Sequence, residues 1–126
     1  MKTSKTIEVQ WGEIDASMHV NNVMYLKWVE SARVDFLIKM NNGMLVNEEH
    51  IGAVVAWLDC KYIRPVRFPD TVRLETIKKE VLTEKIVLET KIYSTVKDRL
   101  VAISRQEIVS YDFMRKCKVP LPINWT

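Results

Sequence analysis

The chain is poor in glycine, with three glycines among 126 residues. The glycine-rich loops that hold nucleotide phosphates, GxGxxG and the P-loop, cannot be built from so few. Cysteine is equally scarce: Cys60 and Cys117 stand far apart, without a CxxC pair. That spacing predicts neither a zinc cluster nor a disulfide framework. The sequence therefore excludes the common glycine-rich nucleotide-binding loops and predicts no metal-binding cluster.

Long apolar runs are also missing. No stretch approaches the roughly 18 apolar residues of a membrane helix, and the opening MKTSKTIEVQ has no apolar core of a signal peptide. Two isolated thiols suit a reducing compartment. We therefore expect a cytoplasmic protein without a membrane partner.

Charge of one sign is not concentrated anywhere. The net charge is +3, and the lysines and arginines are scattered. Nucleic-acid binders usually carry a basic stripe with interleaved aromatic residues, so no nucleic-acid partner is predicted. With 48% apolar and 28% charged residues, residues 1–126 have the composition and size of one globular domain.

The first third of the chain predicts one strand and one long helix. Residues 6–11 alternate apolar and polar side chains, as a strand does. Asn21 and Asn22 are candidate helix N-caps, and Asn41-Asn42-Gly43 is a typical helix end. Between them, apolar residues recur at steps of three and four, which predicts a helix over residues 23–40. The stripe is made of Tyr25, Trp28, Val29, Ala32, Phe36 and Met40, with Lys27, Glu30, Arg33 and Lys39 largely outside it.

The rest of the chain reads as sheet. Strands are predicted over residues 51–63, 71–81, 85–94 and 100–112, with turns near 82–84 and 96–99. Hairpin-linked strands give an antiparallel meander. The helix can cover one face of such a sheet, and the other face would need a second layer or a partner. The fold class is α+β, and the pattern by itself permits several folds of that class.

The chemistry is concentrated before the helix. Residues 11–33 place two acids, Glu13 and Asp15, and one histidine, His19, just before the Asn21-Asn22 pair. The N-terminus of a helix presents unpaired N–H groups and the positive end of the helix dipole. Such an end can stabilise a developing oxyanion, and a nearby acid can act as nucleophile or general base. These are the minimum parts of an acyl-transfer hydrolase.

The same segment resembles a known signature. Glu13-Ile14-Asp15, His19-Val20-Asn21-Asn22, Tyr25-Leu26 and Glu30-Ser31-Ala32-Arg33 are similar to the motif of the 4-hydroxybenzoyl-CoA thioesterase-like and acyl-CoA thioesterase families of hotdog proteins, and also to part of the acyl-ACP thioesterases. A weaker match follows at Tyr62-Ile63-Arg64-Pro65, with Asp70 closing the turn. The resemblance implies a hotdog fold, in which a five-stranded antiparallel sheet wraps one long helix.

The resemblance also implies a function and a site. The expected reaction is hydrolysis of an acyl thioester of coenzyme A or of acyl carrier protein, without a metal or redox cofactor. Asp15 would be the catalytic carboxylate, and a backbone N–H near Asn22 or Val23 would hold the carbonyl oxygen. His19 is a further catalytic candidate, and Asn21 and Tyr25 join Val23 as candidate substrate contacts. A homodimer, or a homotetramer built from it, is the expected assembly.

One residue departs from the family pattern. Many relatives carry glycine before the histidine, whereas this chain has Met18. Glycine adopts a positive φ angle at little cost, and methionine does not. We therefore expect either a different loop or a pocket shaped by the methionine side chain.

Each candidate also has a structural interpretation. An aspartate before a helix is usually a turn residue, His19 and the asparagines can simply hold the loop, and Tyr25 is at core spacing. Glu30, a second acid candidate, fits an ion pair with Arg33 better. Glu13 could face solvent, pair with a cation or tune the pKa of Asp15.

Two other functions remain as alternatives. The chain could bind acyl ligands or a carrier protein without turnover. A dehydratase on the same fold would carry a different Asp/His motif, which is not found.

Overall fold

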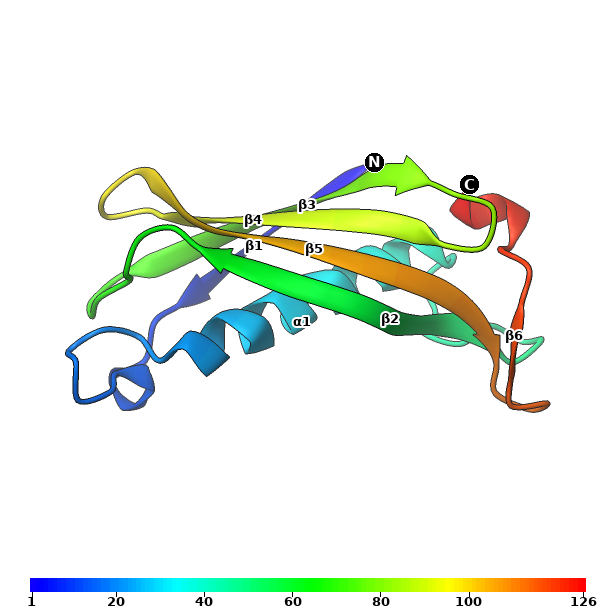
Figure 1. Ribbon diagram of the computed structural model, residues 1–126, viewed down its shortest axis with the longest axis horizontal. Coiled ribbons are helices and arrows are strands. Elements are labelled where there is room, and N and C mark those ends of the chain that lie inside the picture. The colour runs from blue at the N-terminus through cyan, green and yellow to red at the C-terminus, as the bar shows by residue number, and fades with distance from the viewer.

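The computed structural model describes residues 1–126 as one helix lying against one curved sheet (Figure 1). The strands are β1 (Lys2–Glu8), β2 (Ile51–Tyr62), β3 (Thr71–Val81), β4 (Ile86–Ser94), β5 (Arg99–Asp112) and β6 (Cys117–Val119). Helix α1 covers Asn22–Met40. A short 3-10 turn, η1 (Trp11–Glu13), lies between β1 and α1, and a second, η2 (Ile123–Trp125), follows β6. The arrangement of a long helix wrapped by an antiparallel sheet confirms the expected hotdog fold.

The strand order differs from the predicted meander. The sheet runs β1-β3-β4-β5-β2, so only β3, β4 and β5 follow one another as hairpins. β2 pairs with β5 at one edge, and β1 pairs with β3 at the other. The segment between β2 and β3 is not a hairpin turn. It packs against the start of α1, where the Val66 N–H donates to the Tyr25 hydroxyl at 3.0 Å. Prolines at positions 65 and 69 suit this non-strand connection.

A sixth strand was not predicted. β6 is three residues long and pairs with Ser110–Asp112 of β5. The alternation of so short a strand beside Pro120 is too brief to be detected. The first strand also starts earlier than expected, because its polar residues lie on a solvent-facing edge. It ends at Glu8, and Trp11 lies in η1, 64% exposed.

The helix ends as its caps predict. The Asn21 side chain accepts a hydrogen bond from the Val23 N–H at 2.9 Å. At the other end Asn42 takes a φ of 54°, and the Gly43 N–H donates to the carbonyl of Ile38 at 2.7 Å. This is the Schellman pattern that satisfies the last carbonyls of a helix.

The predicted apolar stripe of α1 is buried against the concave face of the sheet. Its N-terminal half, with Tyr25, Trp28, Val29 and Ala32, joins one core cluster, and Phe36 and Met40 join a second. The prediction was wrong for Arg33, because this residue is also buried. Its one ion-pair partner is Glu30, three residues earlier in the helix, at 3.9 Å. Loss of hydration lowers the pKa of the Arg33 guanidinium.

The opposite face of the sheet carries many charged side chains. Charged side chains on neighbouring strands pair across it, as Lys79 does with Glu89 and Lys85 with Glu107. Arg73 also lies over the ring of Tyr93 at 4.6 Å. This face is suited to water. No helix in the chain has the length and apolarity that crossing a lipid bilayer requires.

Candidate active site

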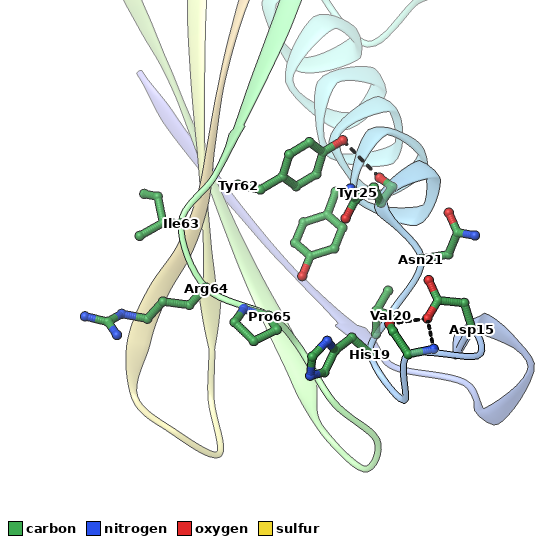
Figure 2. A pocket seen from close by; sticks show the side chains of 11 residues that line it. Asp15, His19, Val20, Asn21, Tyr25, Tyr62, Ile63, Arg64 and Pro65 are labelled. Atoms are coloured by element: carbon green, nitrogen blue, oxygen red, sulfur yellow. Dashed lines mark hydrogen bonds between the residues drawn. The ribbon is translucent and has the colours of Figure 1, made fainter.

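A cavity of about 440 Å³ opens at the N-terminus of α1. One wall is the loop before the helix, and the other is the end of β2 with the connection that follows it (Figure 2). The lining residues are Asp15, Ser17, His19, Val20, Asn21, Asn22, Tyr25, Tyr62, Ile63, Arg64 and Pro65. Five of the six predicted site residues are therefore brought together. Val23 is not among them, and its side chain is 57% exposed.

The loop that carries Asp15 is closed by its own backbone. The Asp15 N–H donates to the carbonyl of His19, and the Met18 N–H donates to the carbonyl of Asp15, each at 3.0 Å. Met18 takes a φ of 66°, so the methionine adopts the left-handed conformation that glycine adopts most easily. Its side chain is 62% exposed and does not line the cavity. The loop thus keeps a glycine-like backbone without glycine.

The carboxylate of Asp15 is held by one oxygen and free at the other. Oδ1 accepts hydrogen bonds from the Ser17 N–H at 2.8 Å and from the Ser17 hydroxyl, while Oδ2 has no partner in the protein. The pKa of Asp15 is lowered from the usual value of an aspartate. The hydrogen bond from the Ser17 hydroxyl is the main cause, the hydrogen bond from the Ser17 N–H is the second, and the charge of His19 adds to the effect. Asp15 is therefore ionised at neutral pH.

The helix N-terminus leaves one N–H free. The Val23 N–H is taken by the Asn21 side chain, and the Met24 N–H by the Asn21 carbonyl at 2.9 Å. The Asn22 N–H has no acceptor in the backbone or side chains of the protein, and Asn22 lines the cavity. Of the two N–H groups expected to bind a carbonyl oxygen, only that of Asn22 is unoccupied.

Two tyrosines fix the far wall. The Tyr62 hydroxyl donates to the Asn22 carbonyl at 3.1 Å, and the Tyr25 and Tyr62 rings meet edge to face at 5.1 Å. Tyr25 is 2% exposed, and burial raises the pKa of its hydroxyl. Figure 2 shows that hydroxyl pointing toward Pro65. The far wall is thus tied directly to the helix start.

The far wall of the cavity, which the end of β2 and the connection after it form, was not predicted from the sequence. The run Tyr62-Ile63-Arg64-Pro65 carried part of the family resemblance but was not assigned to the site. It reaches the cavity because the crossing connection packs on the helix start, where the Val20 N–H donates to the carbonyl of Val66 at 2.8 Å. In the sequence, the weaker family resemblance of residues 62–65 was the one sign that this segment belongs to the site.

Other candidate residues lie elsewhere. Glu13 accepts a hydrogen bond from the Gln10 N–H at 2.7 Å, where it caps η1, and the causes of the lowered Asp15 pKa are Ser17 and His19 instead. Glu30 is exposed and pairs with Arg33. Burial raises the pKa of the Cys60 thiol, which keeps it from being a reactive thiolate. No three His, Cys, Asp or Glu side chains gather into a group that could hold a metal ion.

Comparison with known proteins shows the family of this chain. The family model of the thioesterase-like superfamily matches residues 9–124. The long-chain acyl-CoA thioesterase FadM of Escherichia coli (strain K12) is 32% identical over 89 residues, which are 66% of this chain and 67% of FadM.

Solved structures share the fold. A candidate thioesterase from Pseudomonas aeruginosa, PA2801, is 27% identical with a TM-score of 0.82, over 94% of this chain and 91% of that one. YbaW, a candidate thioesterase from Escherichia coli, shares the fold at 23% identity and a TM-score of 0.86, over 97% of this chain and 92% of that one. The chain belongs to the thioesterase-like superfamily and is a hotdog-fold thioesterase.

Proposed function

We propose that this protein hydrolyses acyl-CoA thioesters to a free acid and a thiol, with Asp15 as the catalytic carboxylate. The observation that carries the proposal is the pairing of a free, ionised carboxylate oxygen on Asp15 with the unoccupied N–H of Asn22 in one cavity. The similarity to FadM supports acyl-CoA as the substrate class.

Each group has a role in the reaction. The Asn22 N–H, at the positive end of the helix dipole, donates a hydrogen bond to the thioester carbonyl oxygen and stabilises the oxyanion. Asp15 then acts in one of two ways. Either Oδ2 adds to the carbonyl carbon, forming an anhydride that water cleaves, or Oδ2 takes a proton from water, which adds instead. In both routes the C–S bond breaks, and the departing thiolate takes up a proton.

The other predicted residues support this pair. Asn21 holds the Val23 N–H, so that the first turn offers the Asn22 N–H alone. His19 lines the cavity, and its positive form favours the ionised state of Asp15. Tyr25 gives the cavity a rigid apolar wall. An acyl-ACP substrate would present the same thioester to the same groups.

Thiol release tests the function. A panel of short, long and aromatic acyl-CoA substrates is mixed with the protein and a chromogenic thiol reagent. We expect release from at least one member of the panel. A protein that shifts its melting temperature with acyl-CoA but frees no thiol from acyl-CoA or acyl-ACP would be a binding module, which contradicts the proposal.

We also propose a homodimer joined along β2. β2 is an edge strand of 12 residues, and unpaired edges of this length are usually covered. Trp57, Leu58 and Tyr62 on it are 47%, 40% and 41% exposed. A homotetramer would add a contact between such dimers. Solution mass by light scattering at micromolar concentration tests the proposal, and a strictly monomeric mass would contradict it.

A further inference from the structure

The hydroxyl of Tyr62 makes the one side-chain hydrogen bond that joins β2 to α1. Tyr62 is the last residue of β2, and its hydroxyl donates to the carbonyl of Asn22, the first residue of α1, at 3.1 Å. Figure 2 shows the Tyr62 side chain extending from the strand toward the start of the helix. The end of β2 is therefore attached to the same residue whose N–H is free in the cavity.

Asn22 has few other attachments. The first residues of a helix lack partners for their N–H groups, and helix ends fray. On the N-terminal side of Asn22, the Asn21 side chain holds the Val23 N–H at 2.9 Å. On the other side, Tyr62 holds the Asn22 carbonyl. The orientation of Asn22 thus depends on two contacts, one from Asn21 and one from Tyr62.

Tyr62 is itself held in place by its surroundings. Its ring meets the Tyr25 ring edge to face at 5.1 Å, which is a preferred arrangement of two aromatic rings. The next two residues, Ile63 and Arg64, donate their N–H groups to the carbonyl of Val101, at 2.8 and 3.1 Å. The hydroxyl is therefore presented to α1 from a fixed position.

The Tyr62 hydroxyl contacts the helix and not the thioester. A tyrosine hydroxyl carries one proton, and this proton is donated to the Asn22 carbonyl. Burial is the main cause that raises the pKa of the Tyr62 hydroxyl, so the proton stays on it at neutral pH. Tyr62 lines the cavity but has no second proton with which to stabilise an oxyanion directly.

We infer that Tyr62 is a positioning residue of the acyl-transfer site, whose hydroxyl fixes Asn22 so that the free Asn22 N–H meets the thioester carbonyl oxygen. The inference rests on the proposed function. A donor stabilises an oxyanion best when it already points to where the charge develops, and a small misplacement lowers the rate strongly. The far wall thus contributes to the reaction rate and not only to the shape of the cavity.

The variant Tyr62→Phe tests the inference, because it removes the hydroxyl and keeps the ring. We expect kcat to fall at least about tenfold, since a loosened donor loses part of the roughly hundredfold that one oxyanion donor supplies. KM should stay within about twofold, because the affected interaction is made in the transition state. Steady-state thiol release from acyl-CoA measures both. An unchanged kcat, or a loss confined to KM, would overturn the inference.

Tyr111→Phe is the matched control. Tyr111 also stands in an edge-to-face pair, with Phe113 at 5.0 Å, and it lies opposite Gly52, at the other end of β2 from Tyr62. This variant should keep kcat within about twofold of the native value. An equal fall of kcat in both variants would mean that removing any such hydroxyl has the same effect, which contradicts a special role of Tyr62.

The pH dependence of kcat separates positioning from proton transfer. A positioning residue moves no proton, so Tyr62→Phe should lower kcat by the same factor at every pH and leave both limbs of the profile in place. Loss of a basic limb in this variant would show that Tyr62 transfers a proton, and the positioning role would be wrong.

A double variant tests whether Tyr62 acts through Asn22. Asn21→Ala and Tyr62→Phe each loosen the same residue, so the double variant should lose less kcat than the product of the two single losses. Losses that multiply would show that Tyr62 acts independently of the helix start, against the inference.

Amide hydrogen exchange separates this inference from the proposed function, because it needs no substrate. In Tyr62→Phe, the Val23 and Met24 N–H groups of the first turn should exchange at least about threefold faster than in the native protein, and in Tyr111→Phe they should not. Faster exchange supports the Tyr62 contact even if the native protein cleaves no thioester. Unaltered exchange contradicts the inference even if Asp15 proves catalytic.

Discussion

Asp15 and Asp112 sit at opposite ends of the molecule in turns of the same kind. Each accepts a hydrogen bond from the N–H two residues later, on Ser17 and Met114 respectively. Each has a lowered pKa because of the hydrogen bonds it accepts. Each turn also holds a non-glycine residue with positive φ, Met18 at 66° and Lys116 at 58°.

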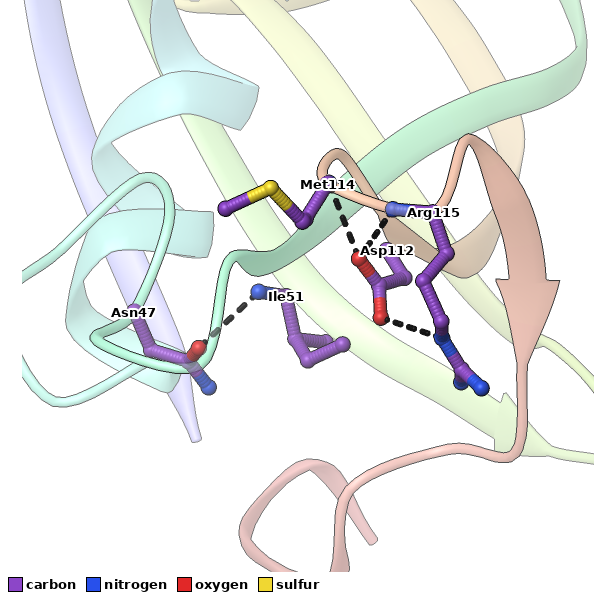
Figure 3. Close-up of polar contacts among 5 residues, drawn as sticks. All are labelled: Asn47, Ile51, Asp112, Met114 and Arg115. Atoms are coloured by element: carbon purple, nitrogen blue, oxygen red, sulfur yellow. Dashed lines mark hydrogen bonds and ion pairs between the residues drawn. The ribbon is translucent and has the colours of Figure 1, made fainter.

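The two carboxylates differ in what remains free. Both oxygens of Asp112 are used: Oδ1 by the Met114 and Arg115 N–H groups and Oδ2 by the Arg115 guanidinium, each at 2.9 Å (Figure 3). Asp15 keeps Oδ2 free beside a cavity and an unpaired helix N–H. A lowered pKa alone therefore does not mark a catalytic acid. The unused oxygen in a cavity is the distinguishing feature.

Asp15 and Asp112 should differ most when the carboxylate of each is replaced by an amide. Asp15→Asn should lower kcat at least about a hundredfold, since it removes a positioned catalytic group, with little change in melting temperature. Asp112→Asn should do the reverse, with kcat within about twofold and a lower melting temperature. Steady-state thiol release and thermal unfolding measure both. Loss of kcat in Asp112→Asn at a temperature where it is folded would contradict a purely structural role for Asp112.

Two asparagines whose side chains accept hydrogen bonds from backbone N–H groups give a smaller contrast. Asn21→Ala should cost about 1 kcal/mol of unfolding free energy, as N-cap removal does, and should lower kcat severalfold by loosening the Asn22 N–H. Asn47 is the matched control, because its Oδ1 accepts from the Glu49 and Ile51 N–H groups, each at 2.9 Å, at the far end of the helix (Figure 3). Asn47→Ala should destabilise without affecting kcat. Equal kcat losses in both variants would remove the special role of Asn21.

The two aspartates should also differ in how they affect the pH dependence of activity. In the proposed reaction the active form of Asp15 is the carboxylate, so activity should be present above its lowered pKa and should be lost as the pH falls through it. Ser17→Ala removes the strongest cause of the lowering. The pKa should rise, and the acidic limb of kcat should move to higher pH while activity at neutral pH is kept. Arg115→Gln, which alters the pKa of Asp112 instead, should leave that limb in place.

The smallest effects concern the backbone. Met18→Gly and Lys116→Gly each relieve a left-handed conformation but add freedom to the unfolded chain. We expect each to change the unfolding free energy by less than about 1 kcal/mol, measured by urea unfolding. Met18→Gly should keep kcat, because the side chain lies outside the cavity. A large fall in kcat would mean that the methionine shapes the site after all.

The helix and most strands could be predicted from the sequence, but the order in which the strands pair could not. The helix could be bounded by its caps, and the predicted strand 71–81 coincides with β3, because these features depend on neighbouring residues. The pairing of β2 with β5 depends on distant contacts that periodicity does not encode. Asp15, His19, Asn21, Asn22 and Tyr25 were found together because one segment holds them. Tyr62 and Arg64 were not, since only the fold brings them near.

In the proposed reaction the Asp15 carboxylate performs chemistry and does not merely shape the cavity. Single-turnover thiol release with enzyme in excess, together with the Kd for acyl-CoA, tests this claim most directly in the native protein and Asp15→Asn. We predict a Kd unchanged within about threefold and a rate constant lowered at least about a hundredfold. An unchanged rate constant, or a loss fully explained by weaker binding, would contradict the claim.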